Sequence, residues 1–133
     1  MAEKSSETLD KLLYDTLRDT LDAERQITKA LPKLAKSATN PELKKSFETH
    51  LKQTEEQITR LERVFEMIDK AARGKHCKGM EGLIAEGQEA IEEYEPGDVL
   101  DAALISAARR SNTMRFRPMA PCVPMRNCWI CRK

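Results

Sequence analysis

The sequence contains little of what a β-protein needs and nothing long enough to cross a membrane. Aromatic residues make up only 5% of its 133 residues, whereas 34% are charged. A sandwich or barrel would need many short strands rich in aromatic and β-branched residues, so this composition indicates a mainly helical protein. No stretch approaches the roughly 18 consecutive apolar residues of a membrane-spanning helix.

The N-terminal residues also lack the apolar core of a secretory signal peptide, because charged side chains recur from the third residue onward. Only one cysteine, Cys77, lies within the first 109 residues, which is typical of a protein in a reducing compartment. We therefore expect a cytoplasmic protein. The excess of acidic residues in this part argues against nucleic-acid binding.

Acidic residues are absent after Asp101, and this absence divides the chain. Residues 1–109 hold 17 Lys and Arg and all 22 Asp and Glu, a net charge of −5. Residues 110–133 hold 6 Lys and Arg and no acid, together with three of the four cysteines and three prolines spaced three residues apart. Such prolines exclude an α-helix. The contrast predicts a helical domain over 1–109 and an irregular basic tail over 110–133.

Apolar residues recur at helical spacing through most of the first 109 residues. The first predicted helix spans about 6–38, and the second runs from Pro41 to about 72, with Asn40 as its N-cap. The short link between them makes these two long helices antiparallel. Two shorter helices are predicted over about 80–94 and 99–110, separated by a Pro-Gly turn.

Three polar residues lie on the apolar stripes of the two long helices: Glu24, His50 and Thr54. A hairpin that turns near residue 40 pairs positions whose numbers sum to about 79, which places Glu24 opposite residue 54 or 55. An uncompensated carboxylate in a core costs several kcal/mol, so it must be protonated, paired or bound to a metal. Inward carboxylates and histidines build di-iron or di-manganese sites in helical bundles. Alternatively, such a glutamate reaches water at the edge of its stripe, and the histidine is an ordinary hydrogen-bonded core residue.

Five segments of the chain are distinctive when taken together: DAERQ, ALPKLA, FxxHL, MEGLI and DAALIxAA. They resemble the YciE/YciF family of ferritin-like stress proteins, and the resemblance covers residues 8–109. It implies a rubrerythrin-like helical bundle from a cytoplasmic, stress-associated protein. It also implies that Glu24 and His50 occupy positions of the family's metal site, with iron or manganese as the metal.

The family pattern stops after Ala108, where the resemblance implies a long helix that carries Glu, His and Tyr. This chain has Arg110-Ser111-Asn112-Thr113-Met114 instead. The codons of these and the following residues, read one base out of frame, permit a family-like amphipathic sequence. We therefore interpret residues 110–133 as a frameshifted tail. The Cys128–Cys131 pair in this tail lacks the second pair of ligands that a structural zinc site needs.

The frameshift interpretation predicts a one-base insertion or deletion near codon 110 of the coding DNA. Sequencing from codon 105 to beyond the stop codon tests it. An intact reading frame, with the same tail present in relatives, would show that the interpretation is wrong.

The sequence thus predicts an all-α fold: a long antiparallel helical hairpin plus short helices, which together form a truncated, ferritin-like bundle. The expected function is that of a stress-response protein with a di-metal site. Glu24 and His50 would be ligands of this site, which is incomplete because the later helices are missing. The alternative is a non-catalytic helical hairpin that forms a dimer through its exposed stripe. No residue indicates a catalysed reaction, and we expect neither nucleic-acid nor membrane partners.

Overall fold

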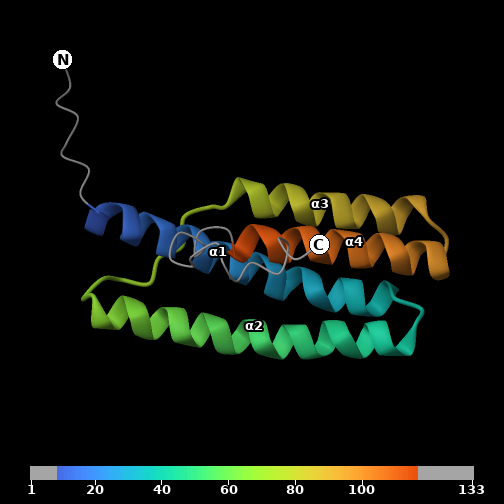
Figure 1. The fold of residues 1–133 in the computed structure, drawn as a ribbon, viewed down its shortest axis with the longest axis horizontal. Helices are drawn as coiled ribbons and strands as arrows, with labels where there is room; N and C mark the ends of the chain where they lie inside the picture. The colour runs from blue at the N-terminus through green and yellow to red at the C-terminus, as the bar shows by residue number, and fades with distance from the viewer. Residues whose placement is uncertain (1–8, 117–133) are drawn as a thin grey trace, which may run out of the picture.

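The computed structural model describes residues 9–116, which form four α-helices aligned along one long axis (Figure 1). These are α1 (Leu9–Ser37), α2 (Pro41–Met67), α3 (Lys78–Glu93) and α4 (Asp98–Phe116). Within this range there is no strand, and the predicted all-α fold class is confirmed. No helix in the described range is both long and apolar enough to cross a membrane.

The hairpin of α1 and α2 forms where the sequence places it. The side chain of Asn40 accepts hydrogen bonds from the backbone N–H groups of Glu42 and Leu43 at 2.8 and 3.2 Å, so it caps α2 as predicted. Further along the hairpin, the rings of Tyr14 and Phe65 meet edge to face, with centroids 6.0 Å apart. Since the numbers of these two residues sum to 79, they fix the register that the sequence predicts.

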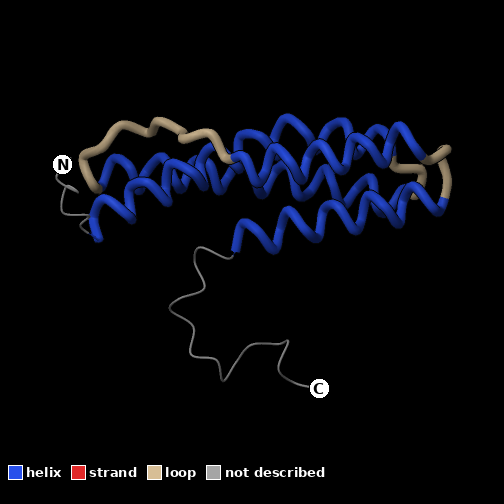
Figure 2. Tube along the Cα trace, turned by 90° about the horizontal axis from the view of Figure 1, so that it is seen from above, coloured by secondary structure: helices blue, strands red, loops and turns tan. Residues whose placement is uncertain are grey.

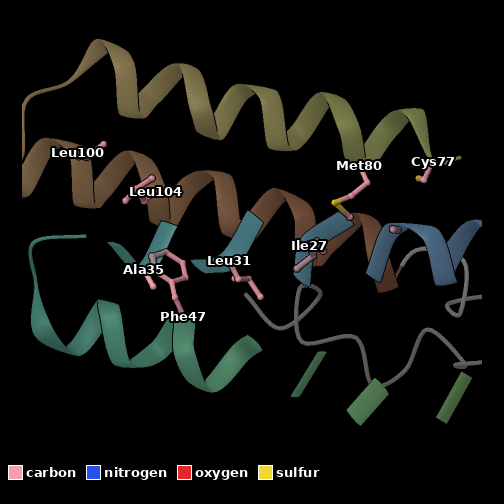
Figure 3. Packing of buried hydrophobic residues seen from close by; sticks show 9 residues of the cluster. Ile27, Leu31, Ala35, Phe47, Cys77, Met80, Leu100 and Leu104 are labelled. Atoms are coloured by element: carbon pink, nitrogen blue, oxygen red, sulfur yellow. The ribbon is translucent and has the colours of Figure 1, made fainter. Parts of the chain in front are cut away.

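The core consists of two hydrophobic clusters, and α1 contributes to both. The first cluster lies where α1 meets the start of α2 and the α3–α4 pair; Phe47, Met80 and Leu104 belong to it (Figure 3). The second cluster lies between α1 and the end of α2, and its members are Leu17, Leu21, Leu61 and Phe65. Helix α1 packs against all three other helices, and α3 packs against α4. Seen from above, the helices again lie along one long axis (Figure 2).

Two predicted helix ends are wrong. Helix α2 ends at Met67 rather than near residue 72, because Asp69 adopts a left-handed backbone conformation with φ of 53°. The N–H groups of Asp69 and Lys70 then donate to the carbonyls of Glu66 and Phe65 at 3.1 and 3.0 Å, which is a Schellman motif.

Helix α4 runs to Phe116, six residues beyond the expected end at Arg110. Residues 110–116 of the predicted tail are thus helical, whereas its residues 117–133, with the Cys128–Cys131 pair, lie outside the described residues. Residues 110–116 contain no proline or glycine. The hydroxyls of Ser111 and Thr113 also bond back to the carbonyls of Ala108 and Arg109, at 2.8 and 3.0 Å, so they leave no polar group that competes with the helix.

Asp101 fastens α4 to the turn between α1 and α2. Its carboxylate accepts three hydrogen bonds: from the backbone N–H and the hydroxyl of Thr39, at 2.9 and 2.7 Å, and from the backbone N–H of Asn40 at 2.9 Å. These bonds, those from Thr39 first, hold the pKa of Asp101 below its ordinary value. A lowered pKa means that the ionised carboxylate stabilises the fold at neutral pH, and that this contribution is lost as the pH falls.

We expect the substitution Asp101→Asn to lower the melting temperature at pH 7. The difference from the unaltered protein should narrow as the pH falls below about 4, where Asp101 becomes protonated in the unfolded chain, and should be lost once the pH is below the lowered pKa of the folded protein. Thermal unfolding followed by circular dichroism at several pH values measures this. Asp98→Asn is the control, because Asp98 also lies in the first turn of α4 but is exposed. A difference that stays constant down to low pH would contradict the assigned role.

Candidate functional site

A polar layer crosses the middle of the α1–α2 hairpin. Glu24 on α1 is 4% exposed and Thr54 on α2 is fully buried. On α1, Glu24 lies between Leu21 of the second hydrophobic cluster and Ile27 of the first. Thr54 likewise lies between members of the two clusters on α2. The structure therefore places both residues inside the hairpin, at the boundary between two apolar regions.

The hydrogen bonds of this layer restrict what each group can do. The hydroxyl of Thr54 donates to the backbone carbonyl of His50 at 2.9 Å, so its hydrogen is used within α2 and is not directed at Glu24. The Oε2 atom of Glu24 is buried away from solvent. A carboxylate in this position depends on polar interactions inside the bundle, because the surrounding apolar clusters solvate an ionised group poorly.

His50 is half-buried and lies at the border of two hollows. One is an apolar pocket of about 30 Å³, which has Ile27 on one wall and Ser111 on another. This volume is close to that of one water molecule, so the pocket is too small for an organic ligand. The other is an open groove of about 500 Å³ between α2 and α4, in which His50 and Gln53 face Ala108 and Asn112.

The residues present do not fit a di-metal centre. Among residues 9–116 there is no group of three or more His, Cys, Asp and Glu side chains placed to hold a metal ion. Glu48 and Glu55, which neighbour the polar layer in sequence, are exposed on α2. Glu24 and His50 supply only two protein donors, whereas carboxylate-bridged di-metal sites in bundles use about six.

A second polar cluster joins the loop before α3 to α1. Asp22 accepts hydrogen bonds from the backbone N–H of Cys77 at 2.8 Å and from the side chain of Gln26 at 2.6 Å. The ring of His76 lies between two carboxylates, with Nδ1 3.7 Å from Asp22 and Nε2 2.9 Å from Glu81. The sequence did not predict this cluster, because no motif relates residues 22–26 to residues 76–81.

The directions in which the pKa values of this second cluster are shifted fit a structural role. Burial raises the pKa of Asp22, but the hydrogen bonds from Cys77 and Gln26 outweigh that effect and leave it lowered. The hydrogen bond to Glu81 raises the pKa of His76. Burial raises the pKa of the Cys77 thiol, so the thiol is neutral and a poor nucleophile. The cluster therefore ties α3 to α1 and does not resemble a catalytic centre.

Comparison with known proteins identifies the family. The model of a family described as a domain of unknown function, DUF892, matches residues 8–115. The chain belongs to this family. It is 44% identical over 105 residues to Protein YciF of Escherichia coli strain K12, and this match covers 77% of the chain and 63% of YciF. The chain thus spans less than two thirds of that relative.

Solved structures support the same assignment. The crystal structure of the E. coli stress protein YciF aligns with a TM-score of 0.77 and 39% identity, over 81% of this chain and 69% of that one. YcfI from Rhodopseudomonas palustris aligns with a TM-score of 0.81 and 37% identity, over 87% of this chain and 76% of that one. The predicted membership of the YciE/YciF family is confirmed.

We expect Glu24→Leu to lower the free energy of unfolding by about 1 kcal/mol or more, because it removes the interaction that this buried carboxylate makes inside the bundle. Urea denaturation measures the change. Glu55→Leu, at an exposed position on α2, is the control and should stay within about 0.5 kcal/mol. A gain of stability in Glu24→Leu would contradict this expectation and would show that the carboxylate is a net cost to the fold.

Proposed function

We propose that this protein is a non-catalytic helical scaffold of a stress response, and that it acts as a pair of identical chains. Its membership in a family with a stress protein supports the biological setting. The observation that carries the proposal is an apolar face at one end of the hairpin, which α3 and α4 leave uncovered. We call this end the overhang: residues 9–20 of α1 and 58–67 of α2.

The overhang arises because α3 and α4 are shorter than the hairpin. Helix α3 begins beside Asp22, to which the preceding residue Cys77 is hydrogen-bonded. Helix α4 starts at the height of Thr39 and runs back along α1; by Ser111 it has reached Ile27. The start of α1 and the end of α2 therefore extend beyond both shorter helices (Figure 1).

Large apolar side chains are concentrated on the overhang. Leu9, Leu12 and Leu13 of α1 are 83%, 63% and 52% exposed, and Met67 of α2 is 83% exposed. The next residues on the same side of α1 are threonines 16 and 20, whose hydroxyls donate to the carbonyls of residues 12 and 16. Because these hydroxyls already donate within the helix, the stripe from Leu9 to Thr20, about three turns long, can be buried without the loss of hydrogen bonds to water.

The loop of residues 68–77 leaves this stripe open. It is bound to another side of α1 by two hydrogen bonds of 3.0 Å. The side-chain Nε of Arg18 donates to the carbonyl of Arg73, and the backbone carbonyl of Arg18 accepts from the N–H of Lys75. Tyr14, next to the loop, is flanked by the cationic groups of Arg18 and Lys70. The loop thus places charged side chains at the border of the overhang, and it does not cover Leu9 or Leu12.

A second copy of the chain is the occupant that suits this face. A helical stripe of leucines packs best against another helix with ridges of similar spacing. A two-fold axis brings the same patch of both chains together, so each copy supplies the stripe that covers the other. The two overhangs would then form a four-helix bundle around one shared core.

We expect the unaltered protein to be a dimer at micromolar concentration, and the double variant Leu12→Glu/Leu13→Glu to be a monomer. Analytical ultracentrifugation measures the mass, and circular dichroism verifies that the helices persist. Val99→Glu on α4 is the matched control, because Val99 is 64% exposed but lies away from the overhang. A monomeric unaltered protein, or an equal effect of the control, would refute the proposal.

A second candidate function is binding of iron or manganese by Glu24 and His50, and the buried polar layer is the observation that favours it. These residues would supply an anionic oxygen and an imidazole nitrogen, both of which suit such metals. Because they are only two donors, we expect this chain to hold either metal weakly or not at all.

A further inference from the structure

The ring of His76 lies between two carboxylates that belong to different helices. Its Nε2 atom is 2.9 Å from the carboxylate of Glu81 on α3, and its Nδ1 atom is 3.7 Å from the carboxylate of Asp22 on α1. The two ring nitrogens point away from each other, so the two carboxylates cannot bind one metal ion together with this ring. Both edges of the ring therefore face negative charge.

This arrangement suits the protonated ring better than the neutral one. A neutral imidazole has one N–H group, whereas the protonated ring has two. If the neutral ring donates from Nε2 to Glu81, the lone pair on Nδ1 faces the negative charge of Asp22. The other tautomer would turn its lone pair towards Glu81 instead. Only the protonated ring presents an N–H group to each carboxylate, and so links α3 to α1 through its charge.

The carboxylate of Asp22 also holds the residue at which α3 begins. It accepts hydrogen bonds from the backbone N–H of Cys77 at 2.8 Å and from the side chain of Gln26 at 2.6 Å, and Gln26 donates to the carbonyl of Cys77 at 3.1 Å. The loop also passes close to this carboxylate, because a β-carbon added at Gly74 would lie 3.2 Å from that of Asp22. The charge of His76 therefore acts on the group that fixes the entry into α3.

The α3–α4 pair has a second attachment to the hairpin, and that one is of a different kind. Asp101 in the first turn of α4 accepts hydrogen bonds from the backbone N–H groups of Thr39 and Asn40. Because the pKa of Asp101 is lowered, its charge does not change near neutral pH. Helices α3 and α4 pack against each other. The pair is thus held by one attachment that does not titrate near neutral pH and by another that includes a histidine.

We propose that His76 is a pH-sensitive switch that holds the start of α3 on α1 when its ring is protonated and loosens this contact when the ring is neutral. Among the described residues, the charged groups that face the ring are Asp22 of α1 and Glu81 and Lys78 of α3. The hydrogen bond to Glu81 contributes most to the raised pKa of His76, and the charge of Lys78 opposes it. The contact is therefore complete below the ordinary pKa of 6.5, and it weakens as the pH rises through the raised value.

The experiment is hydrogen exchange of single backbone amides in the full chain, followed by NMR between about pH 6 and pH 9 and corrected for the intrinsic effect of pH on exchange. We expect the protection of the Cys77 N–H to fall by about two- to fivefold over this range, because exposed ion pairs contribute modestly. The N–H of Thr39, which is bound to Asp101, is the internal reference and should keep its protection. In His76→Gln the protection of the Cys77 N–H should not depend on pH.

Titration of the His76 ring, also followed by NMR, tests the partner on α3. Glu81→Gln should lower the pKa of His76 and reduce the effect of pH at Cys77. Glu89→Gln is the matched control, because Glu89 is exposed about two turns further along α3, and it should change neither. The proposal is overturned if the protection of Cys77 is constant over this pH range in the unaltered chain, if Thr39 loses protection equally, or if His76→Gln keeps the pH effect.

Discussion

Packing on α1 is the constraint on which the rest of the structure depends. This one helix presents Leu17 and Leu21 to the end of α2, and Ile27 and Leu31 to the cluster shared with α3 and α4. The positions of the other helices follow from which apolar residues of α1 are available along its length. Where α1 meets the α3–α4 pair the core is thick; where only α2 covers it, the core is thin and leucines remain exposed.

The hairpin could be predicted from the sequence because its determinants are local. Apolar spacing, the Asn40 cap and a short link fix both helices and their register, and the Tyr14–Phe65 contact agrees with that register. The burial of Glu24 followed from the same periodicity. The ends of α2 and α4 were predicted wrongly. Helix α2 ends early because Asp69 adopts a backbone conformation that glycine usually takes. Helix α4 continues through residues whose apolar side chains show no helical period.

The contacts that join segments far apart in the chain could not be predicted. Asp101 bonds to Thr39, and Asp22 bonds to Cys77, across more than 50 residues in each case. A carboxylate that accepts backbone N–H groups has no sequence pattern, because any residue can supply the donor. Asn112 could not be placed opposite His50 for a different reason: with α4 expected to end at Arg110, position 112 had no helix to carry it across the groove.

In the described residues, the open apolar face and the small number of polar side chains around His50 have one physical origin, which is the reach of α4. In the described residues α4 runs from the height of Thr39 to the middle of α1, where Ser111 and Ile27 line one pocket. It leaves Leu9 and Leu12 exposed, and Asn112 is the polar residue of α4 that lines the groove beside His50. The apolar face can be covered by a second copy, since burial of leucines needs only complementary shape. A metal site is less tolerant, because it needs particular donor atoms at fixed positions. Self-association therefore makes a smaller demand on the sequence of this bundle than metal binding does.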